Sequence, residues 1–136
     1  MPAIAFDKLD EKVTIRVAGK KVTITPEVFV ISSTFDQEGR SPLTFIVEGL
    51  GTDESLEIDF KLQGRDKGPF RLEGGRRRRP VRGRYLFNFN ARGASSQPSG
   101  GIDPKFFGKR SVWKYDVVLR RGSEDLVAID PMGVLK

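Results

Sequence analysis

The sequence contains neither histidine nor cysteine among its 136 residues. Without histidine, the chain lacks the side chain that most often acts as a general base near neutral pH. Without cysteine, it has no thiolate nucleophile, no disulfide and no thiolate ligand for zinc or copper. Most classes of enzyme are therefore disfavoured, and the usual zinc and copper sites cannot form.

The chain also lacks a long apolar run. No stretch approaches the roughly 18 residues that a membrane-spanning helix needs. The N-terminal residues 1–8 lack the basic region and the apolar core of a secretory signal. From these two absences we expect a cytoplasmic protein with no membrane span.

What the sequence does contain is typical of one globular domain. Hydrophobic residues make up 38% of the chain and charged residues 31%, which argues against a disordered, collagen-like or membrane protein. Two separate cores in 136 residues would each bury too little apolar surface. We therefore predict a single domain over residues 1–136.

Apolar and polar residues alternate along much of the chain, which predicts β-strands. In the clearest example, Leu56, Ile58 and Phe60 alternate with charged residues, so one strand face is buried and the other is charged. No segment has a convincing helical period. The predicted strands lie near residues 13–17, 22–24, 28–31, 43–47, 56–62, 85–89, 113–119 and 126–129. Seven or eight short strands predict an all-β, antiparallel β-sandwich, with a β-barrel as the alternative.

The C-terminal region carries a resemblance at the level of the fold. An aromatic alternating segment, Trp113 to Leu119, is followed by a short turn, by Leu126 to Pro131 and by the apolar pair Val134 and Leu135. This pattern resembles the closing hairpin of small bacterial immunoglobulin-like or cupredoxin-like β-sandwich domains. The resemblance implies a sandwich but no function, because this architecture hosts unrelated activities and the copper ligands of cupredoxins are absent.

Two segments rich in glycine interrupt the strand pattern. Residues 63–84 also contain two prolines and most of the arginines, and residues 91–109 also contain several serines. Long loops in a compact domain are usually either functional or disordered. We therefore predict flexible loops at about 63–84 and 91–109, and we regard both as candidate binding regions.

The strongest chemical feature of the sequence is an arginine run. Ten lysines and arginines lie between residues 65 and 92 with only two acids, a local charge of +8 in a chain of net charge +6. Guanidinium groups can bind phosphate or carboxylate oxygens in pairs. The alternative interpretation is a solvated basic loop that keeps the protein soluble. The candidate anion-binding residues are Arg76, Arg77, Arg78, Arg79, Arg82 and Arg84.

These features predict a non-enzymatic binding or assembly module that contacts an acidic partner through the Arg-rich loop. The partner would be an acidic protein surface or a nucleic acid bound without sequence specificity. The alternative is a structural subunit of a homo-oligomer, whose arginines serve packing or solubility. The sequence has no dinucleotide fingerprint, phosphate loop or nucleophile elbow, so we expect no cofactor and no metal.

A cluster of carboxylates supports a more distant alternative, a carboxylate-based or metal-dependent hydrolase using Asp53, Glu57 and Asp59. Glu57 and Asp59 are two residues apart and would project from the same strand face, which suits a general acid and base or a hard cation. However, an acidic outer face is also an ordinary way to keep a sheet soluble and to discourage edge pairing. Such a face would equally complement the Arg-rich loop of a neighbouring copy.

Overall fold

The computed structural model describes residues 9–34, 41–61, 69–71, 83–84, 86–102 and 106–136. Over these residues the chain is all-β and contains no α-helix, as predicted. The strands are β1 (Lys12–Ala18), β2 (Lys21–Thr25), β3 (Val28–Ile31), β4 (Thr44–Glu48), β5 (Glu54–Lys61), β6 (Phe70–Arg71), β7 (Gly83–Arg84), β8 (Leu86–Asn90), β9 (Ser96–Pro98), β10 (Ser111–Arg121), β11 (Glu124–Ile129) and β12 (Met132–Leu135).

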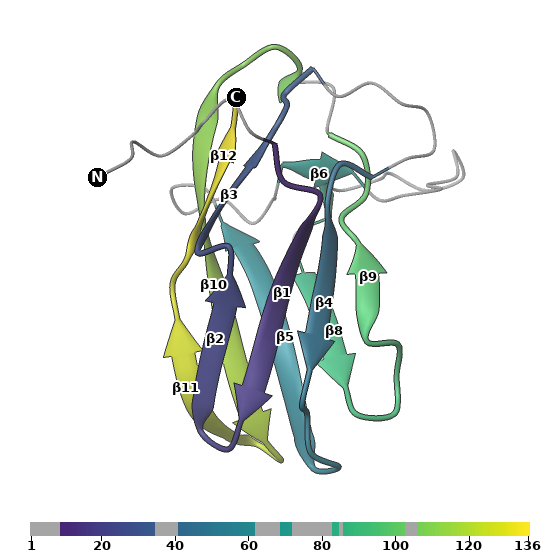
Figure 1. The fold of residues 1–136 in the computed structure, drawn as a ribbon, viewed down its shortest axis with the longest axis vertical. Helices are drawn as coiled ribbons and strands as arrows, with labels where there is room; N and C mark the ends of the chain where they lie inside the picture. Colours follow the sequence, from purple (N-terminus) through teal and green to yellow (C-terminus); the bar gives the residue numbers. More distant parts are fainter. Residues whose placement is uncertain (1–8, 35–40, 62–68, 72–82, 85, 103–105) are drawn as a thin grey trace.

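Two sheets form the body of the protein (Figure 1). The smaller sheet has the strand order β2-β1-β4-β9, and the larger has the order β3-β12-β10-β5-β8, with β11 also paired to β10. Strands β6 and β7 pair with each other as a short separate ribbon. Among the strands that are described, the sheets do not close on themselves, so the fold is a sandwich and the barrel alternative is wrong.

The prediction of purely antiparallel sheets is wrong at two strand pairs. β1 pairs with β4 in parallel, and β12 pairs with β3 in parallel. After the β1–β2 hairpin the chain crosses to the larger sheet as β3 and then returns as β4, so β4 runs in the direction of β1. Side chains alternate with period two in both kinds of pair, so alternation along the sequence cannot distinguish them.

All eight predicted strands are present, but the predicted count is too low. The segment from Leu126 to Ile129 was predicted as the last strand, but β12 follows it and pairs with both β10 and β3. β12 is short and contains Gly133, which weakens its apolar pattern. A Cβ at Gly133 would lie 2.1 Å from Phe29 Cζ, so the ring of Phe29 occupies the space that a side chain there would need. Strand β9, which pairs with β4, lies within the segment 91–109 that was predicted as a flexible loop.

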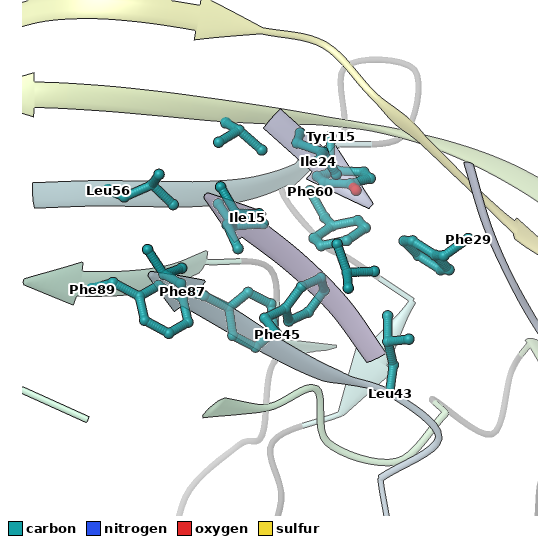
Figure 2. Close-up of a cluster of buried hydrophobic side chains, with 14 of the residues drawn as sticks. Ile15, Ile24, Phe29, Leu43, Phe45, Leu56, Phe60, Phe87, Phe89 and Tyr115 are labelled. Atoms are coloured by element: carbon teal, nitrogen blue, oxygen red, sulfur yellow. The ribbon is translucent and has the colours of Figure 1, made fainter. Parts of the chain in front are cut away.

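The alternating apolar residues fill one core between the two sheets. The ring of Phe60 stacks on that of Tyr115 with centroids 4.7 Å apart, and the rings of Phe45 and Phe87 lie 4.8 Å apart (Figure 2). The predicted burial of Trp113, Tyr115, Phe87 and Phe89 is confirmed. Leu62 and Tyr85, which continue two predicted alternations, lie outside the described residues. Burial of such large side chains is the main source of stability in a fold of this kind.

The two ends of the sandwich differ in their connections. One end, here called the turn end, holds the turns at Gly19–Lys20, Gly49–Asp53 and Gly122–Ser123. Gly49 has a φ of +90°, and a Cβ there would lie 2.1 Å from the carbonyl oxygen of Val17, so the turn requires glycine. At the opposite end β10 begins and β12 finishes, as their register shows (Figure 1).

Candidate functional site

Five of the six candidate arginines lie between β6 and β7 in the sequence, and the sixth, Arg84, belongs to β7. Arg76 to Arg79 and Arg82 lie outside the described residues, and only the backbone of Arg84, in β7, is described. β6 and β7 are antiparallel, with Arg71 opposite Gly83. Because paired strands lie about 5 Å apart, the connection over residues 72–82 begins and ends at neighbouring points of the ribbon.

Phe70 anchors this ribbon to the core of the sandwich. Its side chain is fully buried and meets the ring of Phe60 edge-on, with centroids 5.5 Å apart and planes at 89°. The backbone of Phe70 also forms an isolated bridge to Ile102, which is itself buried. Since Phe60 lies near the end of β5, the ribbon lies at the end of the sandwich opposite the turn end.

Three further cations lie at the same end: Lys109, Arg110 and Lys136. All three are exposed, and none makes an ion pair with any residue that the structure describes. The backbone of Lys136 is held on both sides, because its N–H donates to Ile31 and its carbonyl accepts from the N–H and the hydroxyl of Ser33. We call this end, defined by Lys109, Arg110 and Lys136, the basic end.

A groove at the basic end combines positive charge with apolar surface. It is lined by Arg110, Ser111, Val112, Val134, Leu135 and Lys136. The side chain of Val112 is 50% exposed, whereas Leu135 is buried. This arrangement can bind an anionic group through the cations and an apolar group against the valines.

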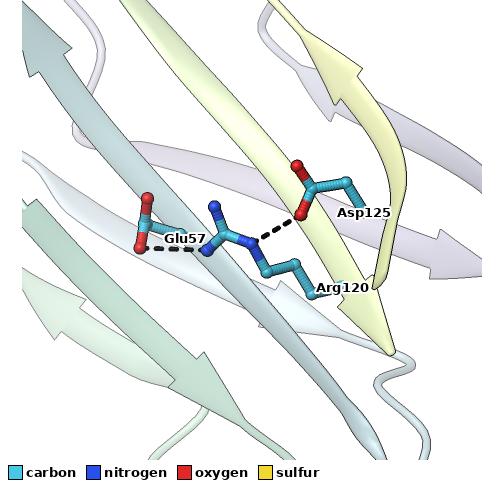
Figure 3. A network of polar contacts seen from close by, with 3 residues as sticks. All are labelled: Glu57, Arg120 and Asp125. Carbon is cyan, nitrogen blue, oxygen red and sulfur yellow. Dashed lines mark hydrogen bonds and ion pairs between the residues drawn. The ribbon is translucent and has the colours of Figure 1, made fainter. Parts of the chain in front are cut away.

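The arginines of the turn end have a different environment, because carboxylates of the same chain pair with them. Arg120 donates from Nη1 to Glu57 at 3.1 Å and from Nε to Asp125 at 2.7 Å (Figure 3). These hydrogen bonds, first that with Asp125 and then that with Glu57, raise the pKa of Arg120 above its ordinary value. Arg16 pairs with Glu48 at 3.0 Å in the same way. These arginines cross-link neighbouring strands.

The predicted acidic residues take part in the same internal pairing. Asp53 lies 3.6 Å from Nε of Arg121, and Glu57 pairs with Arg120. Glu57 and Asp59 do share the outer face of β5, because the alternate residues of that strand are buried in the core. Nowhere in the described ranges do three or more acidic residues form a group that could hold a metal ion.

Lys109, Arg110 and Lys136 were not predicted as site residues from the sequence. They are isolated cations in the sequence, and Lys136 is distant from the other two along the chain. They come together because Ser111 at the start of β10 pairs with Leu135 at the end of β12. The only signal in the sequence was the basic pair Lys109 and Arg110 directly before a predicted strand.

Comparisons of the chain with protein-family models, curated proteins and solved structures gave no match. The described part of the chain holds no helix with the length and hydropathy needed to cross a membrane.

Proposed function

We propose that this protein is a non-enzymatic module that binds polyanions through its basic end. The observation that carries the proposal is that three exposed cations, Lys109, Arg110 and Lys136, gather at one groove without ion pairs to any described residue. The ribbon of β6 and β7, anchored by the buried Phe70, lies at this same end, and the arginine run stands between these two strands in the sequence. Clustered positive charge of this kind attracts phosphate groups and acidic surfaces.

The partner class follows from the chemistry of these side chains. Arginine binds phosphate in a paired geometry, and the sequence of residues 72–82 has a high density of positive charge. We therefore take a nucleic acid, bound through its phosphates and without sequence specificity, as the first partner to test. An acidic protein surface is the second.

The experiment is a titration of the protein with labelled single-stranded DNA at several salt concentrations. The logarithm of the binding constant is plotted against the logarithm of the salt concentration. Each lost phosphate contact should lower the magnitude of the slope by about 0.7. Changing Arg76, Arg77, Arg78 and Arg79 to serine should lower it by up to about 3, and Lys109→Ser with Lys136→Ser by about 1.4. The matched control is Lys20→Ser with Lys21→Ser, which removes two exposed lysines at the turn end and should leave the slope unchanged.

Equal slopes and equal heparin retention for all four proteins would contradict the proposal and would reduce the arginine run to a solvated loop. If the protein then sedimented as a stable oligomer, the alternative of a structural subunit would be favoured. If the arginine and lysine variants lose heparin retention but the native protein does not bind DNA, the result would point to an acidic protein surface as the partner.

A further inference from the structure

The two lateral edges of the sandwich are built differently. Along one edge, β9 of the smaller sheet lies against β8 of the larger, and Gln97 Nε2 donates a hydrogen bond to the carbonyl oxygen of Asn88. Along the other edge, β2 of the smaller sheet faces the β11–β12 connection of the larger, and a cleft lies between them. A side-chain hydrogen bond joins the two sheets along the first edge, whereas no described hydrogen bond joins β2 to the β11–β12 connection along the second.

The backbone of β2 is available for pairing on its outer side. The two-residue turn Gly19–Lys20 makes Ala18 and Lys21 a hydrogen-bonded pair, and such pairs alternate along an antiparallel ladder. The N–H and C=O groups of Val22 and Ile24 therefore point away from β1. β2 is the last strand of its sheet, and no described strand pairs with its outer side.

The cleft beside β2 is mainly apolar and has a volume of about 460 Å³. Val22 and Ile129 are only partly buried, although both pack against the core. A strand added to β2 would point every second side chain into this cleft, because Val22 and Ile24 already do so from the neighbouring strand. The full lining consists of Val22, Thr23, Ile24, Glu27, Val28, Ile129, Asp130, Pro131 and Met132.

The charge of the cleft is opposite to that of the basic end. Its two charged lining residues, Glu27 and Asp130, are both acidic and both exposed. Cations on an occupant would meet these carboxylates at the mouth of the cleft, whereas acidic groups would be repelled. The cleft is thus matched to a basic occupant.

We propose that this cleft binds an extended peptide, which adds to β2 as a further strand of the smaller sheet. The outward groups of Val22 and Ile24 bond the peptide backbone, and alternate apolar side chains of the peptide enter the cleft. Lysine or arginine residues flanking the apolar positions pair with Glu27 and Asp130. This site is separate from the proposed polyanion site and selects a ligand of opposite charge.

The first test uses a capped peptide of sequence Lys-Thr-Val-Thr-Val-Thr-Lys with the full chain, in which the valines and both lysines share one strand face. Binding is followed by fluorescence anisotropy and by hydrogen exchange of the protein. On binding, the amides of Val22 and Ile24 should become protected, whereas those of Thr23 and Thr25, already bonded to β1, should not change. An N-methylated peptide and a peptide with glutamate in place of lysine should each bind about tenfold more weakly.

The second test changes the protein at the edge and at the mouth of the cleft. Val22→Pro removes an outward N–H, replaces the Val22 side chain and removes no hydrogen bond to β1, so it should weaken binding about tenfold without unfolding the protein. Glu27→Lys with Asp130→Lys should weaken binding about fivefold. The matched control, Glu11→Lys with Glu124→Lys, changes two exposed acids outside the cleft and should leave binding unchanged.

Three results would overturn the proposal. The first is no peptide binding at about 1 mM, the weak limit for a specific complex. The second is equal binding by the N-methylated peptide, which would exclude strand addition. The third is protection of Val22 and Ile24 amides that rises with protein concentration in the absence of peptide, which would identify a second copy of the chain as the occupant. If Val22→Pro lowers the unfolding midpoint, the charge variants and the hydrogen-exchange data decide whether the peptide adds to β2.

Discussion

The turn end and the basic end of the sandwich use charged residues for different purposes. At the turn end, Glu54 is 8% exposed and accepts hydrogen bonds from the backbone of Gly51 and the guanidinium of Arg121. At the basic end, Lys109 and Lys136 are exposed and make no ion pair with a described residue. Paired, partly buried charges hold turns in place, whereas exposed single charges add little to stability and are available to a partner. The following variants test this division.

The largest loss of stability is expected from Trp113→Ala, which removes a large buried side chain from the part of the core near the basic end. Trp113 is 1% exposed, its ring meets that of Phe106 edge-on at 5.1 Å, and its Nε1 donates to the hydroxyl of Ser111 at 2.8 Å. Truncation should lower the free energy of unfolding by about 3 to 5 kcal/mol. Urea denaturation measures the change. An unchanged midpoint would mean that the basic end does not depend on this part of the core.

The next largest effect is expected at the turn end, from Gly49→Ala. The positive φ and the close carbonyl of Val17 should together lower the free energy of unfolding by about 2 kcal/mol or more. Gly108→Ala, at the basic end, is the matched control, because Gly108 has a φ of +72° but open space around it. Its loss should be only about 1 kcal/mol. Equal losses in thermal melts would remove the steric part of this explanation.

Glu54→Ala should cost about 2 kcal/mol of stability, because it leaves the N–H of Gly51 without its acceptor and removes one of the two carboxylates that pair with Arg121. Its DNA binding should match that of the native protein. Glu124→Ala, an exposed acid of the same end, should change stability by less than about 0.5 kcal/mol. A Glu54→Ala protein with native stability but altered DNA binding would reverse the proposed roles of the two ends.

The smallest effect at neutral pH is expected from Tyr115→Phe in the core between the two ends. The Tyr115 hydroxyl is buried and has no hydrogen-bond partner among the described residues, so its removal should change stability by less than about 0.5 kcal/mol. Burial raises the pKa of Tyr115. The unfolded chain therefore ionises first, and native stability should fall as the pH rises above about 10. Unfolding at alkaline pH should show a smaller fall for Tyr115→Phe.

The sequence was sufficient for eight of the twelve described strands and for most of the core. Leu56, Ile58 and Phe60, and likewise Trp113 and Tyr115, are buried as their alternation predicts. This works because the period of a strand is a local property, and burying one of its two faces requires apolar residues at every second position. The arginine run was equally evident from the sequence, since charge density along a chain does not depend on its fold.

Tertiary structure decided which strands are neighbours and therefore which side chains share a surface. Alternation fixes the face of a residue but not the direction or identity of the adjacent strand, so the parallel pairs β1–β4 and β12–β3 were not predictable from it. Glu57 meets Arg120 only because β5 pairs with β10. Val22 and Ile129 line one cleft only because β2 and β11, which belong to different sheets, face each other along one edge. Local pattern determined the elements, and long-range pairing determined the sites.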